Sequence, residues 1–287
     1  METGINLIGD APRRSTEYFP DPMCERVAVT GCAMVGWQGR VTGVPMTSEV
    51  PFPAAGWAPA TFLGSLSPAA AAELVALAVR KRFGAGQIIL REGAAAGHVV
   101  LLLSGFTKVA TAVEGFETLL GIRLPGEVVG ETGALTGEPR MATVTACGPV
   151  TAGLVGRAAF QDFLRRRPET ATLVTAAVAR RLRRSDRRLA EFAVFPAHIR
   201  LARLLSEIAE VCAVPHPDGS LELAVPLSQP ELAAMIGIAQ ATVQKAVGEL
   251  RDRGLVRTGY RRVRVLDPLG LRRLGDGETR TGEHESR

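Results

Sequence analysis

The sequence predicts an α+β protein with three consecutive parts: a small antiparallel β-roll, one long helix, and a C-terminal pair of short helices followed by a β-hairpin. Three observations lead to this prediction. Short apolar segments separated by glycine fill residues 87–156, and a helical apolar period begins after residue 167. Two capped helices joined by a glycine turn then lie around residue 237.

Composition sets the class of protein. The composition, with 46% hydrophobic and 22% charged residues, is typical of a globular protein, and a length of 287 residues is sufficient for two domains. No apolar run reaches the roughly 18 residues of a membrane helix, and the first residues do not form a secretory signal. We therefore expect a cytoplasmic protein with no membrane partner.

Catalytic and metal-binding motifs are missing from the sequence. It contains no Gly-x-Ser-x-Gly, no phosphate loop with its lysine, and no acidic or histidine cluster at metal spacing, so we expect no enzymatic activity. The four cysteines, Cys24, Cys32, Cys147 and Cys212, lie far apart, which predicts neither a disulfide scaffold nor a metal site.

The N-terminal half divides into an extension and the roll. Residues 1–56 show no sustained period and predict a poorly ordered extension, with translation from Met46 as the alternative. The roll is expected over residues 57–167 and begins with a helix capped by Ser67 and opened by Pro68. Its predicted strands are QIILREG, HVVLLLSG, FTKVATAV, ETLLGIRL, EVVG, MATVTACG and TAGLVG. A parallel α/β sheet would need helices between them, and none fits.

The long helix is expected over residues 168–195, together with a hinge. An apolar seam at steps of three and four residues runs along it: Val174, Val178, Leu182, Leu189 and Phe192, with Ser185 filling its gap. Six arginines occupy the other faces, which is too much charge for a buried helix. The pattern favours packing against a second copy in a homodimer, and a helix lying on its own domain is the alternative.

Residues 196–270 predict a winged helix-turn-helix. Ser228 and Glu231 form a capping box, and Gly237 ends the first helix just before the second begins. A helix pair joined in this way places its second helix in the DNA major groove. A tail over residues 271–287 is expected to be flexible.

The surface of this part is basic. Residues 240–264 carry seven basic and two acidic side chains, and LVRTGYRRVRVL predicts a wing with a Thr258-Gly259 turn and Arg257, Arg261, Arg262 and Arg264 pointing outward. The residues expected to contact DNA are Ser228, Gln229, Gln240, Ala241, Thr242, Gln244, Lys245, Arg257, Arg261 and Arg262.

The order of these parts, and four motifs within them, resemble the cyclic-AMP receptor protein and FNR (Crp/Fnr) family of bacterial transcription regulators. The motifs, between Phe62 and Leu274, are the glycine turns at Gly93 and Gly105, GETGAL-x-GEPRMA, ARRLRRSDRRL and LSQPELAAMIGIAQATVQKAVGEL. The resemblance implies a cyclic-nucleotide-binding-like jelly roll and a dimer that binds palindromic double-stranded DNA under effector control. RNA polymerase is a further partner that it suggests.

The resemblance also implies an effector pocket. Gly130 would let the backbone approach the ligand, Glu131 would accept from a ribose hydroxyl, and Arg140 would pair with the phosphate of cyclic AMP or cyclic GMP. A short helix after Gly130 would offer free N–H groups to an anion. Glu131 and Arg140 also suit each other without a ligand, which is the alternative role for this pair.

Several residues depart from the family's pattern. Met141 stands where a hydroxyl residue usually adds a phosphate contact, and the loss of one such bond costs about 1.5 to 3 kcal/mol. Thr132 replaces an apolar residue, and Asp186 replaces a small hydroxyl neighbour of the purine-reading Ser185. A different small effector, effector-independent DNA binding, and a winged helix that binds protein all remain open.

Two further departures bear on specificity and on sensing. Gln240, Ala241 and Lys245 stand where well-known members carry an Arg-Glu pair and a second Arg, so we expect a different half-site. An iron–sulfur or haem sensor is not expected, because the closely spaced cysteines are missing and His98 lies in an apolar strand.

Overall fold

The computed structural model describes residues 56–277, all within one compact unit, Val50–Arg287. The predicted extension therefore falls outside the described residues except for Gly56, and so do residues 278–287 of the predicted tail.

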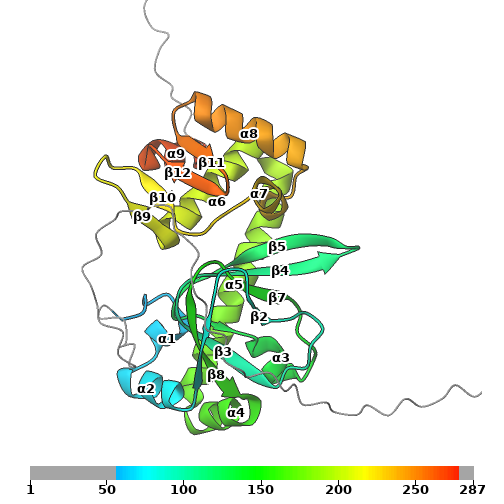
Figure 1. Cartoon of the computed structure of the whole chain (residues 1–287), viewed down its shortest axis with the longest axis vertical. Helices are drawn as coiled ribbons and strands as arrows, with labels where there is room; N and C mark the ends of the chain where they lie inside the picture. Colours follow the sequence, from blue (N-terminus) through cyan, green and yellow to red (C-terminus); the bar gives the residue numbers. More distant parts are fainter. Residues whose placement is uncertain (1–55, 278–287) are drawn as a thin grey trace, which may run out of the picture. The chain divides into compact units, whose positions relative to one another are not determined.

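Two four-stranded antiparallel sheets form the roll (Figure 1). The first sheet, in spatial order, contains β1 (Val79–Phe83), β8 (Val150–Gly156), β3 (His98–Ser104) and β6 (Val128–Val129). The second contains β2 (Ile88–Leu90), β7 (Thr143–Ala146), β4 (Thr107–Val113) and β5 (Phe116–Arg123). All seven predicted strand segments are confirmed. Strand β1 was missed because four of its five residues are exposed and three are basic.

Strand β3 is buried on both faces, which explains why it is a continuous apolar run with no polar alternation. Val100 and Leu102 pack with the second sheet. Val99 and Leu101 pack with Phe160 and helical residues on the other side of the strand. Those helices are α1 (Phe62–Ser65), α2 (Pro68–Ala76) and α4 (Arg157–Arg166). The Ser67 cap and Pro68 start of α2 are confirmed, whereas α4 was not predicted.

The long helix α5 (Pro168–Val194) has Pro168 in its first turn, as predicted. Its apolar seam divides between two environments. Val174 is buried in the roll's own core, but Leu182 and Leu189 are 61% and 62% exposed, and Val178 and Phe192 are also exposed. We call the last four residues the α5 stripe. A run of exposed apolar side chains at helical spacing indicates a surface that another molecule covers.

The C-terminal part combines four helices with a four-stranded antiparallel sheet. Its helices are α6 (Ala197–Cys212), α7 (Gln229–Ile236), α8 (Gln240–Asp252) and α9 (Pro268–Gly275). Its strands, in spatial order, are β11 (Val256–Gly259), β12 (Arg262–Val265), β10 (Leu221–Leu223) and β9 (Ala213–Pro215). The core joins all four helices through the fully buried Leu201, Leu205, Leu250 and Leu271, with Leu232 of α7 beside them.

Two predictions for this part are wrong. The flexible tail was placed from residue 271, yet Leu271 and Leu274 belong to α9 and are buried against α6. The wing turn was placed at Thr258-Gly259, yet Gly259 pairs with Arg262 and leaves Tyr260 and Arg261 at the tip. Arg261 adopts the positive φ of +54° that the tight turn requires, so the glycine was a misleading signal.

Candidate functional site

Gly130 positions the predicted effector pocket. It has φ +77° and caps the short helix α3 (Glu131–Thr136), whose presence was predicted. A Cβ at this residue would lie 2.5 Å from Nη1 of Arg140 and 2.9 Å from Cδ1 of Leu90. The residue is therefore glycine for two reasons: the backbone conformation, and the close approach of the Arg140 guanidinium.

Arg140 points into the roll and is only 5% exposed. Its Nη1 donates to the carbonyl of Gly130 at 2.7 Å, and its Nη2 donates to the carbonyl of His98. Burial lowers the pKa of Arg140, while the nearby carboxylate of Glu131 opposes that shift. Arg140, the residue predicted to bind a phosphate, thus lies in the pocket. Both of its terminal nitrogens, however, already donate to backbone oxygens.

Glu131 is 3% exposed and pairs with Arg181, one of the six arginines expected on the charged faces of α5 rather than in the pocket. Its Oε1 accepts from Nη1 of Arg181 on α5, and Nη2 of Arg181 donates to the carbonyl of Val128 at 2.6 Å. The expectation that Glu131 pairs with Arg140 when no ligand is bound is therefore wrong. The other oxygen, Oε2, is buried without a hydrogen-bond partner among the described residues, so it remains available to a ligand hydroxyl.

The pocket between these groups is small. Its cavity measures about 70 Å³, and it is lined by Leu90, Val109, Arg123, Val129, Gly130, Glu131, Thr132, Gly133, Arg140, Met141, Ala142, Val144 and Arg181. Ligand pockets usually measure roughly 300 to 1,000 Å³, so the pocket as it stands is too small for a nucleotide. Thr132 and Met141 do line it, as expected, although Met141 is largely exposed.

A larger cavity of about 360 Å³ adjoins the first one, and Arg123 and Arg181 line both. Ser185 lines this second cavity, whereas Asp186 is exposed on α5 and lines neither. Burial lowers the pKa of Arg123 to about 10, helped by the charge of Arg181, and its Nε has no partner among the described residues. The position of Arg181 one helical turn before Ser185 was the signal that could have identified it; no pattern marked Arg123.

The helix-turn-helix has the predicted local geometry. Glu231 N–H donates to Oγ of Ser228 at 3.4 Å, and Ser228 N–H donates to Oε2 of Glu231 at 2.7 Å. Gly237 ends α7 with φ +64°, and a Cβ there would lie 2.6 Å from the ring of Phe192. The predicted core positions of α8, Val243, Val247 and Leu250, are buried.

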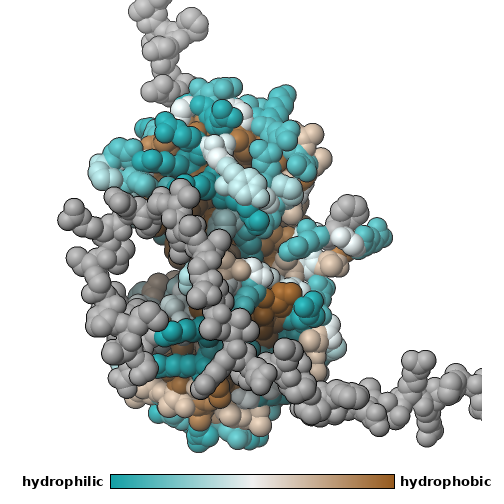
Figure 2. Space-filling model, viewed as in Figure 1, coloured by the Kyte–Doolittle hydropathy of each residue, from teal (hydrophilic) through white to brown (hydrophobic). Residues whose placement is uncertain are grey.

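The opposite face of α8 is exposed. It presents Gln240, Ala241, Thr242, Gln244 and Lys245, all five of which were predicted to contact DNA. Hydrophilic residues cover most of the visible surface around α8 (Figure 2). Ser228 and Gln229 are half-buried at the start of α7, and the Ser228 hydroxyl is already engaged in the cap.

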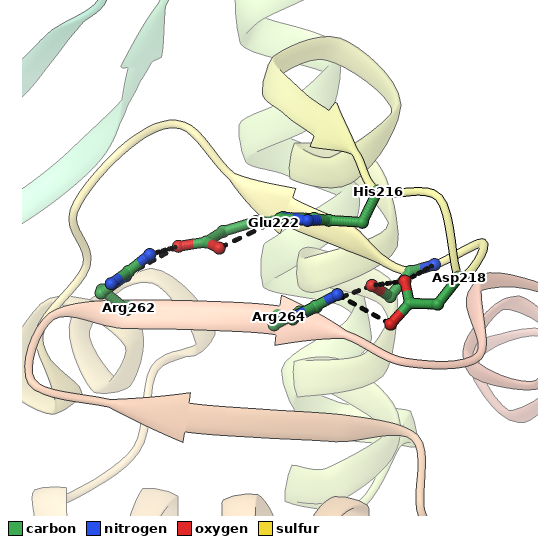
Figure 3. Close-up of polar contacts among 6 residues, drawn as sticks. His216, Asp218, Glu222, Arg262 and Arg264 are labelled. Atoms are coloured by element: carbon green, nitrogen blue, oxygen red, sulfur yellow. Dashed lines mark hydrogen bonds and ion pairs between the residues drawn. The ribbon is translucent and has the colours of Figure 1, made fainter. Parts of the chain in front are cut away.

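In the wing, the basic side chains fall into two groups. Arg257 and Arg261 are exposed. Arg257 has no ion pair among the described residues, and Arg261 has only a long one, with its Nη2 3.9 Å from Oε2 of Glu231. Arg262 is bound to Glu222, and Arg264 is half-buried and bound to Asp218 (Figure 3). The prediction that Arg264 points freely outward is therefore wrong. Tyr260 at the tip is almost fully exposed and was not anticipated.

The structure also describes the surroundings of His98 and of two of the cysteines. His98 opens β3, and burial lowers its pKa. Burial raises the pKa of Cys147 to about 11 and that of Cys212 to about 12, so both thiols are poor metal ligands. Across residues 56–277 there is no group of three His, Cys, Asp or Glu side chains that could hold a metal ion. Over the same residues, none of the helices has both the length and the apolar character to cross a membrane.

Models of known protein families match both the roll and the helix-turn-helix part of the chain. Residues 80–167 match the model of the cyclic nucleotide-binding domain, and residues 199–274 match that of the Crp-like helix-turn-helix domain. A CRP-like cAMP-activated global transcriptional regulator of Mycobacterium tuberculosis is 29% identical over 209 residues, which is 72% of this chain and 93% of that protein. The global nitrogen regulator of Synechococcus elongatus is 27% identical over 194 residues, which is 67% of this chain and 87% of that protein.

A solved structure agrees with these matches. A transcriptional regulator of the CRP/FNR family from Thermus thermophilus covers 70% of this chain and 100% of its own, with 26% identity and a TM-score of 0.60.

Proposed function

Because the chain belongs to the Crp/Fnr family and is a DNA-binding transcription regulator, we propose that it works as a homodimer on a palindromic operator. The observation that carries this proposal is the α5 stripe, where Leu182 and Leu189 stand exposed on a helix whose other end is anchored in the roll. A second copy of α5 would cover these side chains, and two-fold symmetry would then present two α8 helices to two half-sites.

The DNA contacts follow from the exposed faces. Gln240, Ala241, Gln244 and Lys245 would reach base edges from the first turns of α8, with Ser228, Gln229 and Thr242 at its margin. Arg257 and Arg261 of the wing would contact phosphates. Such a regulator would act in the cytoplasm, where it would meet both the chromosome and RNA polymerase.

The effector that we propose for the roll is a cyclic nucleotide, and the cAMP that activates the mycobacterial relative is the first candidate. Its phosphate would take the Arg140 nitrogens from the two carbonyls, and its ribose hydroxyl would donate to the unpartnered oxygen of Glu131. The pocket must widen for this, and we expect Arg181, which lines it and is bound to Glu131, to shift as it widens. Binding would therefore be weakened by the cost of opening, and again by Met141.

Such a ligand would couple the pocket to the dimer helix directly. Arg181 belongs to α5, so any movement of its guanidinium away from Glu131 changes a contact of that helix with the roll. A ligand that favours the opened arrangement shifts the population toward it only by its difference in affinity for the two states.

Selection from a random DNA library followed by titration tests the DNA part of the proposal. We expect a two-fold symmetric sequence to be enriched. Gln240→Ala should change the preferred half-site, whereas Arg257→Ala should weaken binding to all sequences and reduce the salt dependence. Arg273→Ala, an exposed arginine on α9 in the same domain, is the control and should leave binding unchanged. A selected sequence without two-fold symmetry would contradict the dimeric arrangement.

A further inference from the structure

The carboxylates of the β9–β10 hairpin lie directly beside the basic strand of the wing. The sheet places β10 between β9 and β12, so that Leu221 faces Val265 and Glu222 faces Arg264 in register. In Figure 3, Asp218 and Glu222 point from this hairpin toward the guanidinium groups of Arg264 and Arg262.

Glu222 holds Arg262 through two nitrogens. Oε1 of Glu222 accepts from Nε of Arg262 at 2.7 Å and also from its Nη2. The other oxygen, Oε2, lies 3.3 Å from Nε2 of His216. The Arg262 side chain is 73% exposed and that of Glu222 only 21%. A solvent-accessible guanidinium is therefore bound by a largely buried carboxylate.

Asp218 binds Arg264 through one nitrogen, and Ser220 binds a second. In this pair the arginine is the more covered partner, 27% exposed against 61% for Asp218. Nη2 of Arg264 donates to Oδ2 of Asp218 at 2.8 Å, and its Nε donates to Oγ of Ser220 at 2.7 Å. Ser220 is buried and donates to Oδ1 of Asp218 from both its hydroxyl, at 2.6 Å, and its backbone, at 3.1 Å. These bonds, first those from Ser220, lower the pKa of Asp218 to about 2. The three hydrogen bonds hold the carboxylate in place.

The pairing changes what the wing can contribute to DNA binding. A basic residue gains affinity for DNA by replacing the cations condensed on a phosphate, which requires a positive charge that the protein has not already neutralised. Arg262 and Arg264 each carry a paired carboxylate, and an approaching phosphate would meet that carboxylate at close range. Lys245 and Arg257 have no such partner among the described residues, so they keep their full charge.

We propose that Glu222 and Asp218 act as an internal counter-charge that limits the affinity of this protein for DNA of any sequence. The two carboxylates occupy Nε and Nη2 of Arg262 and Nη2 of Arg264, which would otherwise be free to bind phosphates. They thereby lower the sequence-independent part of binding and its dependence on salt, and they leave the base contacts of α8 unchanged. The inference rests on the wing lying against DNA, as proposed above.

The experiment measures the affinity for a duplex of random sequence at several salt concentrations. Glu222→Gln keeps the shape of the side chain and an acceptor for Arg262, but removes the negative charge. We expect this variant to bind about tenfold more tightly at low salt, with a plot of log K against log salt steeper by about one unit, as one extra phosphate contact predicts. Asp218→Asn should act in the same direction.

Two controls separate this effect from others. Glu210→Gln removes the same charge from another exposed pair, Glu210 with Arg272 of α9, and should leave both affinity and slope near the wild-type values. The double variant Arg262→Ala/Glu222→Gln removes the whole pair and should bind within about twofold of wild type, since a neutral pair contributes little net charge.

The outcomes distinguish two failures. If Arg257→Ala weakens binding but Glu222→Gln leaves affinity and slope unchanged or lowers them, the wing contacts DNA and the counter-charge proposal is wrong. If neither variant changes binding, the wing does not lie on DNA, and the proposed DNA contacts of the wing are wrong as well.

Discussion

At the scale of single residues, the pocket of the roll is lined by arginine side chains that point into the protein. Arg140 donates hydrogen bonds to two backbone carbonyls, and Arg181 forms the ion pair with the buried Glu131. A buried carboxylate without a cation would lose its solvation without recovering it, so Arg181 is required for stability even if it must later move for a ligand.

Replacing Arg181 by methionine should therefore destabilise the fold. Loss of one partner from a buried ion pair costs about 3 kcal/mol. Urea unfolding at fixed protein concentration measures this loss, and Arg183→Met is the matched control, because Arg183 is exposed on the same helix and has no ion pair among the described residues. The double variant Arg181→Met/Glu131→Gln should recover most of the stability. An equal and small loss in both single variants would show that the pair contributes nothing.

Gly237 gives a second prediction at this scale, with a control of opposite sign. Gly237→Ala should lower the free energy of unfolding by about 1 kcal/mol or more, because φ is +64° and a Cβ would meet the Phe192 ring. Gly248→Ala, in the interior of α8 with nothing within 4 Å of its Cβ, should raise it by up to about 1 kcal/mol. Thermal unfolding of the two variants checks both signs, and a destabilised Gly248→Ala would contradict this account of α8.

At the scale of elements, the helices and strands that could be predicted are those whose residue pattern follows local burial or local capping signals. The seven strands were predictable because each is a short apolar run bounded by glycine, and α7 because its capping box and C-terminal glycine are local signals. Strand β1 was not, because its exposed basic residues lack any alternation. Strands β9 and β10 were not, because Pro215 and Glu222 interrupt their short apolar runs. The pairing of Glu131 with Arg181 joins residues 50 positions apart on different elements, and no sequence period marks such a pair.

The α5 stripe yields the prediction at this scale. Leu182→Glu should dissociate the homodimer, because it places a charge in the middle of the proposed helix pair, and should leave the unfolding of the isolated protomer nearly unchanged. Analytical ultracentrifugation measures the effect. Arg183→Glu, which makes a larger change of charge one residue off the stripe, should remain dimeric. A monomeric wild-type protein at micromolar concentration would refute the role given to the stripe.

At the scale of the whole molecule, an ion pair between Lys108 and Glu231 joins the roll to the helix-turn-helix. Nζ of Lys108 on β4 donates to Oε1 of Glu231 at 2.6 Å and also to the carbonyl of Pro226, and β5 contacts α7 alongside (Figure 1). Glu231 is the same residue that closes the capping box of α7. The roll therefore touches the DNA-binding part at the residue that fixes the start of its first helix.

This pair makes stability depend on pH. Burial raises the pKa of Glu231, but the hydrogen bonds from Lys108 and Ser228 outweigh it and leave the pKa below its usual 4.5. A lowered carboxyl pKa contributes stability that is present above the unfolded value and is lost as pH falls through the folded value. The free energy of unfolding should thus fall more steeply below pH 4.5 in wild type than in Lys108→Met. Parallel curves from neutral to acidic pH would show that Lys108 does not set this pKa.

We propose that the roll holds an effector pocket that its own guanidinium groups close, and that a cyclic nucleotide opens this pocket by binding Arg140. Calorimetric titration of the purified protein with cyclic AMP and cyclic GMP tests it most directly. We predict saturable binding that is lost in Arg140→Ala and retained in Arg80→Ala, an exposed arginine of β1. Absence of binding up to millimolar nucleotide, or equal binding by Arg140→Ala and wild type, would contradict the claim.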